Sequence, residues 1–572
     1  MTLPKNAQRL AYAAVLAVVA TVHANGLFGV FVFDDVSITE NKRLADPLAF
    51  DWFSIGPRTV GIASFAFQFA FLGRTAFDCH LVNWAIHLTN VALIMALVQR
   101  LTRFRFPNWS SSKHCLTCCA VGCLWGVHPL TTSAVTYVVQ RYESLASLWM
   151  IAALLTWVFA QTKPADDGRI VLVKRVRWPW CVACGAFSCL AFGTKEISAA
   201  LPLILLSTNV CVLYPSVRQA IKRSALPALL MIPISFGAYL RSTGLLRAGN
   251  RTSTIGFGLV GIDWHDYVLF QPVVYLRYLK LILLPTDQVL DYGWLPPQDG
   301  PAMWLGGLGW LLIFVLLAWA FRRLPLLAWS VCCGLLILAV TSVVPLTDSI
   351  FEHRVYLPLA FLVGAAVVAI SARFDGLSVR SSGQAMIGSA VWRRILSVPV
   401  LGALLLILVV YFSAFTNSRN GDYADALRLA KLDLERSPEN PRNVYRMIRL
   451  AEVPESAKLS LLTKAIEMSE DRGYFFPGTN YKWPRELADS YFLQGEMKAA
   501  RPWYERALPE SHDRLQQQEI EWSLALIAAA DGDGSSAEKW FAAALQHDSS
   551  ISPQIQKTYD AFRHASGPTP HP

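Results

Sequence analysis

The sequence predicts an all-α protein in two modules, a polytopic membrane domain followed by a soluble domain of helical repeats. Hydrophobic residues make up 54% of the 572 residues and charged residues only 16%, a composition typical of membrane proteins. Apolar runs of about 20 residues, enough to cross about 30 Å of hydrocarbon, recur along residues 1–416. Residues 417–562 have no such run, and we expect a helical repeat domain there and a disordered tail at 563–572.

The apolar runs predict about eleven transmembrane helices. Their expected positions are 10–33, 81–99, 115–127, 144–160, 179–194, 198–214, 225–243, 302–321, 325–344, 357–372 and 395–415. The stretches 55–72 and 266–284 are harder to assign. The second carries Arg277 and Lys280 and contains Pro272, so we expect a re-entrant or interfacial helix there.

Basic residues concentrate in alternate short loops, which is the positive-inside pattern of membrane proteins. This pattern predicts a cytoplasmic N-terminus and, with eleven spans, a repeat domain on the outer side. It also explains the net charge of +10 without nucleic acid as a partner. His114 and four nearby cysteines (Cys115, Cys118, Cys119 and Cys123) superficially resemble a metal cluster, but we interpret them as packing residues of a helix.

On this topology the outer loops collect the unusual polar residues of the membrane domain. Asp34 and Asp35 open a polar stretch directly after the first apolar segment. Other charged and polar groups follow at Arg58, His128, Arg141, Glu143, Lys195, Glu196, Asp287, Asp291, Glu352, His353 and Arg354. Charged groups at membrane depth usually face a polar cavity, so six sets on one side predict a single outward-facing site.

The C-terminal module contains a sequence repeat. Gly495, Ala500 and Tyr504 recur as Gly532, Ala537 and Phe541, each shifted by 37 positions. The pattern resembles tetratricopeptide repeats, whose helix pairs stack into a solenoid with a concave surface suited to extended peptides. The repeats could instead only pack on the membrane domain.

The outer polar groups fit the transfer of a group from a lipid-phosphate donor. A carboxylate can act as general base on an acceptor hydroxyl, and Arg, Lys or His can hold the departing phosphate without a metal. The sequence contains no P-loop, no Rossmann glycine fingerprint, no H-E-x-x-H and no G-x-S-x-G motif. Nucleotide-driven, metalloprotease and serine-hydrolase chemistry are therefore unattractive.

Several segments resemble one family in the same order along the chain. They are Phe31-Val32-Phe33-Asp34-Asp35, Pro57-Arg58-Thr59, Asn83 to Asn90, His128-Pro129, Lys195-Glu196, Tyr278 to Pro285, and Glu352-His353-Arg354-Val355-Tyr356-Leu357-Pro358. They resemble the transmembrane O-mannosyltransferases that target cadherins and their bacterial relatives, which have the GT-C glycosyltransferase fold and lumen-facing tetratricopeptide repeats. The chain departs from the family pattern where His353 separates Glu352 from Arg354.

The resemblance implies inverting transfer of a sugar from a polyprenyl-phosphate donor to a Ser or Thr hydroxyl of a secreted or periplasmic protein. Asp34 or Asp35 would be the general base, and the sequence leaves the choice open. Arg354 would bind the lipid phosphate, supported by Lys195, Arg141 and His353. The other residues implied in donor or sugar binding are Arg58, His128, Glu143, Glu196, Glu352 and Tyr356. No cofactor is required, although the two acids could bind a divalent cation.

The sequence also allows three rival interpretations. An oligosaccharide ligase or polymerase would use a lipid-diphosphate glycan and would not call for the first-loop acids. A non-catalytic membrane-anchored scaffold would need only its repeats, and a transporter ranks last because no ionisable residue lies in the middle of an expected span. The absence of cysteines from residues 417–572 and the compact loops favour a bacterial inner membrane, with the active site and repeats in the periplasm, over the endoplasmic reticulum.

Overall fold

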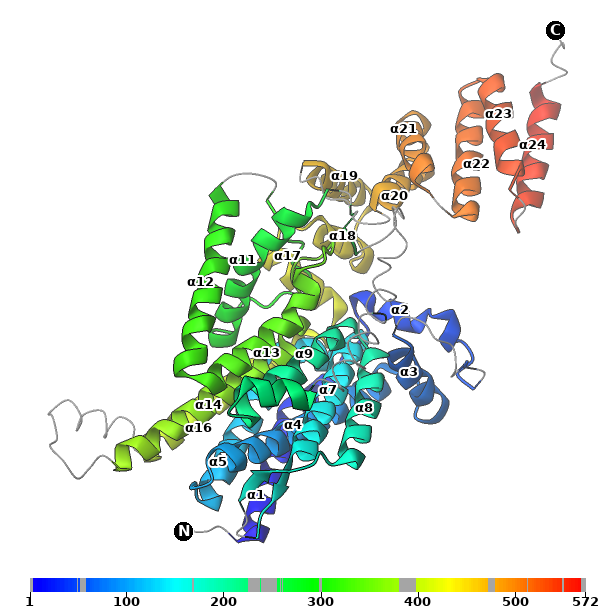
Figure 1. Ribbon diagram of the computed structural model, residues 1–572. Coiled ribbons are helices and arrows are strands. Elements are labelled where there is room, and N and C mark those ends of the chain that lie inside the picture. The colour runs from blue at the N-terminus through cyan, green and yellow to red at the C-terminus, as the bar shows by residue number, and fades with distance from the viewer. Residues whose placement is uncertain are drawn as a thin grey trace. The chain divides into compact units, whose positions relative to one another are not determined.

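The computed structural model describes residues 4–48, 50–51, 58–166, 169–224, 237, 255–257, 259, 261–297, 301–379, 398–471, 479–511, 513–547 and 550–566. These residues are overwhelmingly helical, as the sequence predicts (Figure 1). The chain divides into two compact units near residue 432, and the predicted domain boundary at 416/417 falls inside a long helix that ends at Asp422.

The membrane unit is a bundle of long helices joined by short 3-10 turns. Its α-helices are α1 (Lys5–His23), α2 (Val36–Thr39), α3 (Thr59–Phe71), α4 (Ala76–Arg105), α5 (Ser111–Gly126), α6 (Thr132–Val135), α7 (Arg141–Gln161), α8 (Trp178–Phe192), α9 (Leu201–Thr208), α11 (Trp264–Leu283), α12 (Pro301–Arg323), α13 (Pro325–Ser342), α14 (Tyr356–Val379) and α16 (Val398–Asp422). Its short turns are η1 (Ala24–Phe28), η2 (Phe33–Asp35), η3 (Lys42–Leu44), η4 (Pro129–Thr131), η5 (Val138–Gln140), η6 (Glu196–Ala200), the π-helical η7 (Asn209–Leu213) and η8 (Glu352–Val355).

Eight of the described helices are long and apolar enough to cross a membrane. They correspond to eight of the eleven expected spans. A ninth, α5, bends by 58° into the segment Pro129–Val135, and the pair is either a broken span or a re-entrant loop. The expected span at 179–194 is the shorter apolar helix α8, and the one at 225–243 lies almost wholly outside the described residues. The chain is therefore an integral membrane protein.

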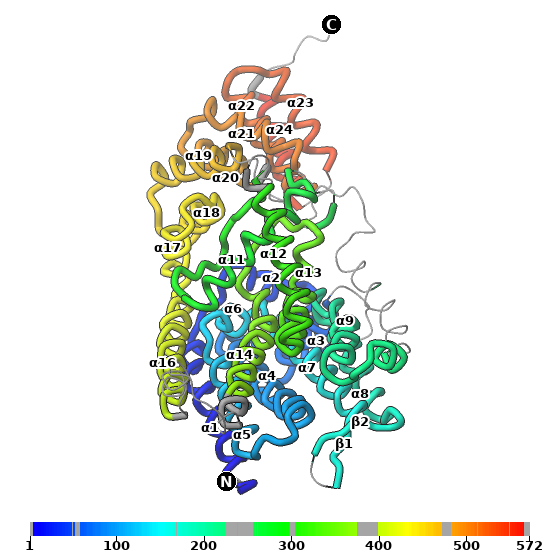
Figure 2. Tube along the Cα trace, turned by 60° about the vertical axis from the view of Figure 1, so that its left-hand side comes forward, coloured from blue at the N-terminus to red at the C-terminus, as the bar shows by residue number. Residues whose placement is uncertain are grey.

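The centre of the membrane unit is a large apolar core around α4, α5, α7 and α14, which pack side by side (Figure 2). Trp125, Trp157 and Tyr356 are among its largest fully buried side chains. The described residues include one small exception to the all-helical prediction. Strand β1 (Thr162–Pro164) pairs antiparallel with β2 (Ile170–Leu172) in the loop after α7.

The C-terminal unit is a series of helices, each in contact with its neighbours along the chain. They are α17 (Ala426–Arg436), which crosses the unit boundary, α18 (Pro441–Leu450), α19 (Glu455–Asp471), α20 (Thr479–Leu493), α21 (Met497–Ala507), the turn η9 (Leu508–Glu510), α22 (Arg514–Ala530), α23 (Gly534–Leu545) and α24 (Ser552–Ser566).

The 37-residue repeat has a direct structural counterpart in this unit. Gly495 and Gly532 adopt left-handed backbone with φ of 78° and 77° at the turns after α20 and α22, a conformation that favours glycine. Tyr504 and Phe541 occupy equivalent buried positions on the following helices. Equivalent residues thus make equivalent turns and cores, as expected for stacked helix pairs.

Candidate functional site

The two adjacent acids of the first loop have different environments. The backbone of Phe33 is left-handed with φ of 47°, a strained conformation for a large side chain. The Asp35 carboxylate points into the protein, where it accepts the backbone N–H of Val32 at 2.9 Å and of Val139 at 2.7 Å. Asp35 is fully buried, whereas Asp34 is exposed. The turn at Phe33 thus sends one carboxylate inward and leaves the other accessible.

The buried acid ties the first loop to the segment before α7. Burial raises the pKa of Asp35 from 3.8 to about 7, and the amide N–H groups of Val32 and Val139 oppose this shift. The backbone N–H of Asp34 donates to the Tyr137 hydroxyl at 3.0 Å. Both contacts fix η2 against η5, so the position of Asp34 is set by neighbours on a rigid part of the fold.

Two ion pairs lie beside the start of α7. Arg58, at the start of α3, donates from Nε to Glu196 Oε1 at 3.0 Å and from Nη2 to Glu196 Oε2 at 3.2 Å. Lys195 Nζ lies 2.8 Å from Glu143 Oε2, and it donates to Gln140 Oε1 at 2.9 Å. The second pair is almost completely buried. Four of the residues predicted for the site therefore form two adjacent pairs.

Three cations act electrostatically on the His353 imidazole, and two of them, Lys195 and Arg58, are paired with carboxylates. The positive charges of Lys195, Arg354 and Arg58 all act on this buried ring, which stacks on Phe351. Arg354 donates to the backbone carbonyls of Ser349 at 3.0 Å and Asp348 at 2.8 Å. No carboxylate neutralises Arg354 among the residues that the structure describes. The region around His353 is therefore the part of the site best suited to an anion.

The Arg141 side chain joins three helices of the membrane unit. Its guanidinium is fully buried and donates to Asn83 Oδ1 at 2.6 Å, Gln68 Oε1 at 2.5 Å and the Cys79 carbonyl at 3.1 Å. It also lies over the Phe65 ring, 3.8 Å from the centroid. These contacts join α3, α4 and α7, so Arg141 holds the helices that carry the ion pairs.

Glu352 and His128 also make contacts that fix loops. Glu352 accepts hydrogen bonds from the Val289 N–H at 2.8 Å, the Tyr292 hydroxyl at 2.7 Å and Gln288 Nε2 at 2.8 Å. His128 Nδ1 accepts the Leu130 N–H at 3.2 Å, and Nε2 donates to the Ile282 carbonyl at 3.0 Å. Both side chains are buried, and they attach η8 and η4 to the segments around α11.

Tyr356 lies in the interior of the bundle. Its hydroxyl is 2.8 Å from His87 Nδ1 and accepts from Asn90 Nδ2 at 3.1 Å. His87 also contacts the Gly126 carbonyl at 3.0 Å through Nε2. His87 is thus an interhelical hydrogen-bonding residue, as its place in an apolar span beside Asn83 and Asn90 predicts.

Sequence reasoning missed the partners that hold the site. Tyr137, Gln288 and Tyr292 contact Asp34 or Glu352, but none of them belongs to a sequence pattern that would single it out. Gln68 was also missed as a partner of Arg141. A polar side chain within an apolar stretch was the available signal for Gln68, because such a residue needs a partner when buried.

The cysteine and histidine cluster of α5 does not form a metal site in the described part of the chain. No group of three His, Cys, Asp or Glu residues there could hold a metal ion. His114 Nδ1 instead contacts the Thr102 hydroxyl at 3.0 Å, and Cys118 belongs to the apolar core.

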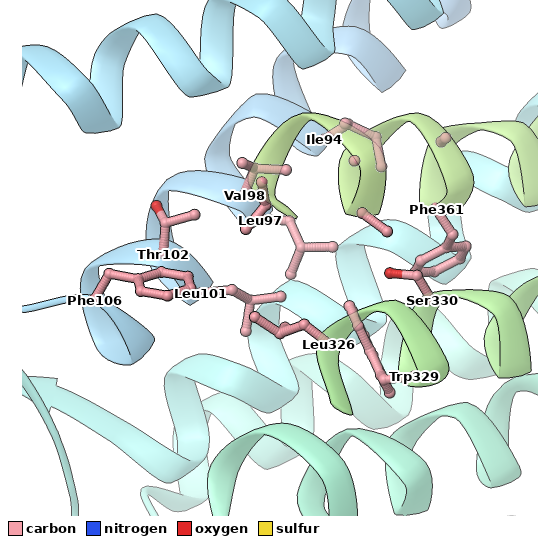
Figure 3. A pocket seen from close by; sticks show the side chains of 14 residues that line it. Ile94, Leu97, Val98, Leu101, Thr102, Phe106, Leu326, Trp329, Ser330 and Phe361 are labelled. Carbon is pink, nitrogen blue, oxygen red and sulfur yellow. The ribbon is translucent and has the colours of Figure 1, made fainter. Parts of the chain in front are cut away.

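A narrow apolar crevice of about 50 Å³ runs between α4, α13 and α14 (Figure 3). Leu97, Leu101, Trp329 and Phe361 are among its lining side chains. It contains none of the charged site residues and lies further along α14 than Arg354. The crevice is therefore lined by apolar core side chains and is separate from the polar site.

The fold and site define a class, an integral membrane protein whose helix ends carry a cluster of acids and cations. The chain is similar to protein O-mannosyl-transferase TMTC3 of Mus musculus, with 29% identity over 169 residues, covering 27% of this chain and 17% of that protein. The human TMTC3 is 28% identical over 172 residues. Tmtc3 of Drosophila melanogaster is 31% identical over 153 residues, 22% of this chain and 16% of that protein.

These matches confirm the resemblance to transmembrane protein O-mannosyltransferases over part of the chain. The matched segment spans less than a fifth of each relative's length. No protein-family model matches the chain. No solved structure is significantly similar to it.

Proposed function

We propose that this protein is an inverting membrane glycosyltransferase that moves a sugar from a polyprenyl-phosphate donor to a Ser or Thr hydroxyl of a protein. The similarity to protein O-mannosyl-transferases supports protein O-glycosylation as the activity. The observation that carries the proposal is the different placement of Asp34 and Asp35, since it offers one accessible base on a fixed support.

Asp34 is the general base in this proposal. A base must reach the proton that it removes, and geometry takes precedence over pKa in choosing it. Asp35 has the pKa nearer to neutrality, but it is fully buried and both of its oxygens accept backbone N–H groups. Asp34 is exposed next to it. Asp35 is accordingly a positioning residue for Asp34.

The cations around His353 would receive the donor phosphate. The acceptor oxygen attacks the anomeric carbon opposite the phosphate, and its proton passes to Asp34. The bond from that carbon to the phosphate oxygen breaks, and the phosphate leaves with the electron pair. Arg354 is the first candidate to hold this phosphate, because no described carboxylate neutralises it. Arg58 and Lys195 also act on His353, but each is paired with a carboxylate, so Arg354 carries the proposal.

A polyprenyl donor needs an apolar surface for its tail. The crevice between α4, α13 and α14 (Figure 3) begins about two helical turns along α14 from Arg354, because Ala360 is its first lining residue on that helix. An isoprenoid chain could follow this face while its phosphate stays at the polar end. This arrangement favours a lipid-linked donor over a soluble one.

The proposal needs no metal, because Arg and Lys side chains can neutralise a monophosphate leaving group. A divalent cation at the two acids is the alternative. We place the protein in a bacterial inner membrane, with its N-terminus cytoplasmic and its site and repeats periplasmic; the endoplasmic reticulum is the alternative compartment. The repeat domain would contact the protein acceptor.

The direct test is transfer of radiolabelled sugar from a panel of polyprenyl-phosphate donors to envelope proteins. Membranes with the wild type are compared with membranes that contain equal amounts of Asp34→Asn. We expect labelling by the wild type from at least one donor and a loss of about 100-fold or more in the variant. Equal labelling by both, or transfer only from a lipid-diphosphate glycan, would overturn the proposal and favour a ligase or polymerase.

A further inference from the structure

The repeat domain contains a polar groove of about 430 Å³ whose described lining residues all lie on its own helices. Its lining residues come from α18, α19, α20 and α22, and they are Arg449, Lys458, Lys482, Arg485, Glu486, Asp489, Ser490, Leu493 and Gln516. The membrane unit contributes none of them. The groove is thus distinct from the site around Asp34 and Arg354.

One face of α20 forms the floor of this groove. Lys482, Glu486, Asp489 and Leu493 follow one another at intervals of three or four residues, which places their side chains on the same side of a helix. The groove therefore follows the axis of α20 for about three turns. An extended chain of several residues would fit along it.

The acids of the groove already have partners inside the domain. Glu486 Oε1 accepts from the Tyr445 hydroxyl at 2.6 Å, and Asp489 Oδ1 accepts from the Tyr504 hydroxyl at 2.6 Å. Arg485 lies 3.6 Å from Asp489 and 2.6 Å from Glu519. The acids are thus engaged with neighbours. Together with Glu455 and Glu519, which pair with lining cations, four acids balance the four lining cations, and Lys482 is the lining cation without a carboxylate partner among the described residues.

The other cations are more accessible. Lys482 is exposed and lies over the Tyr445 ring, 5.6 Å from its centroid. The Arg449 side chain is 63% exposed and lies 3.9 Å from Glu486. Lys458 pairs with the exposed Glu455 at 3.4 Å. Exposed pairs of this kind contribute little and exchange readily for a stronger anionic partner.

Two buried polar atoms of the groove have no hydrogen-bond partner among the described residues. They are Ser490 Oγ, on a side chain only 1% exposed, and Gln516 Oε1. A buried polar atom without a partner costs about 1–3 kcal/mol, so such atoms often mark a place where a ligand or water completes the bonding. A hydroxyl and an amide oxygen are suitable partners for the C=O and N–H of a peptide backbone.

We propose that this groove binds an extended acidic peptide segment, with Lys482, Arg449 and Lys458 contacting its carboxylates and Ser490 and Gln516 contacting its backbone. The inference rests on the proposed function, because it names the chemistry of the acceptor protein that the repeats would recruit. It goes further in assigning the recruiting site and its charge preference.

The test is fluorescence anisotropy with the full-length protein in detergent micelles. The probe is a fluorescein-labelled peptide in which Glu alternates with Thr, and the matched probes carry Gln or Lys in place of Glu. We expect the Glu peptide to bind about tenfold more tightly than the Gln peptide, with an affinity that falls as salt is raised. Equal binding of the Glu and Lys peptides, or binding of neither, would overturn the inference.

A pair of matched variants localises the binding. Lys482→Glu reverses one charge in the groove, whereas Lys539→Glu makes the same change on α23, where Lys539 is also exposed and also lies 5.6 Å from an aromatic ring centroid, that of Trp540. We expect Lys482→Glu to weaken binding of the Glu peptide about tenfold or more and Lys539→Glu to leave it unchanged. Equal effects of the two variants would show that the groove is not the site.

Two further outcomes separate this inference from its rivals. Competition by phosphatidylserine vesicles as effective as that by unlabelled Glu peptide would reassign the groove to a membrane surface. Peptide binding can be measured whether or not sugar transfer occurs. Binding with no transfer would therefore contradict the proposed glycosyltransferase activity and support peptide binding in the groove. Transfer with no selective binding would support the glycosyltransferase activity and contradict peptide binding in the groove.

Discussion

The membrane unit and the repeat unit use charge in opposite ways. In the membrane unit the charged groups of the site are largely buried and carry specific partners, as in the Lys195–Glu143 pair. In the repeat unit most ion pairs are at least partly exposed, such as Arg501–Glu505. Different residues therefore mark the candidate sites of the two units. In the membrane unit the exposed Asp34 and the buried Arg354 stand out, whereas in the repeat unit the exposed Lys482 does.

The largest expected effect concerns the buried ion pair. Lys195→Met should destabilise the protein by about 3–5 kcal/mol, because it leaves the Glu143 carboxylate buried without its cation. Thermal unfolding in detergent would measure the loss. Lys280→Met is the matched control, since Lys280 pairs with Asp287 at 3.6 Å and both side chains are about half exposed. The control should change stability by less than about 1 kcal/mol. Equal losses in the two variants would contradict the claim that the buried ion pair matters more than the exposed one.

The next effect concerns the cation around which the phosphate proposal is built. Arg354→Gln should lower sugar transfer about 100-fold, since it removes the charge that the proposal assigns to the donor phosphate. Arg354 donates to backbone carbonyls and lies 5.3 Å from the Phe351 ring centroid. Arg74→Gln is the control, because Arg74 donates to the Ala45 carbonyl and lies over the Phe69 ring. Initial rates at saturating acceptor would be compared. A similar loss in the two variants would assign Arg354 a structural role only.

The smallest effect is a pH dependence of stability. Because the folded state raises the pKa of Asp35 from 3.8 to about 7, the stabilisation due to its protonated form is complete below about pH 4 and is lost as the pH rises through 7. We expect the wild type to melt at a lower temperature at about pH 8 than at about pH 5. Asp35→Asn should flatten this difference, and Asp34→Asn should retain it. A wild type more stable at the higher pH would contradict the assignment.

The elements that follow from periodicity could be predicted from the sequence. Long apolar helices and the 37-residue repeat depend on local patterns, and Gly495 and Gly532 adopt the equivalent turns that the repeat predicts. The expected span at 115–127 ends where α5 bends into η4, close to Gly126 and Pro129, but no local pattern predicts the angle of 58° between the two segments.

The candidate site was predicted as a set of residues, but their separate contacts were not. Asp34 and Asp35 are neighbours in the chain, and only the left-handed turn at Phe33 separates an exposed acid from a buried one. The resemblance implies Arg141 and Glu352 in donor binding, and their observed contacts hold helices together at Arg141 and a loop at Glu352. Such contacts join segments distant in sequence, so no local pattern encodes them.

Asp34 and Asp35 have different roles in this account, general base and positioning residue, and one paired measurement tests this difference. Asp34→Asn and Asp35→Asn would each be assayed for the initial rate of sugar transfer and for melting temperature. Asp34→Asn should melt like the wild type and lose transfer by about 100-fold or more. Asp35→Asn should melt at a temperature that no longer falls between about pH 5 and pH 8, since an amide mimics the neutral acid and cannot ionise, and should keep measurable transfer. An Asp34→Asn variant with full transfer, or an Asp35→Asn variant that is stable and inactive, would contradict the account.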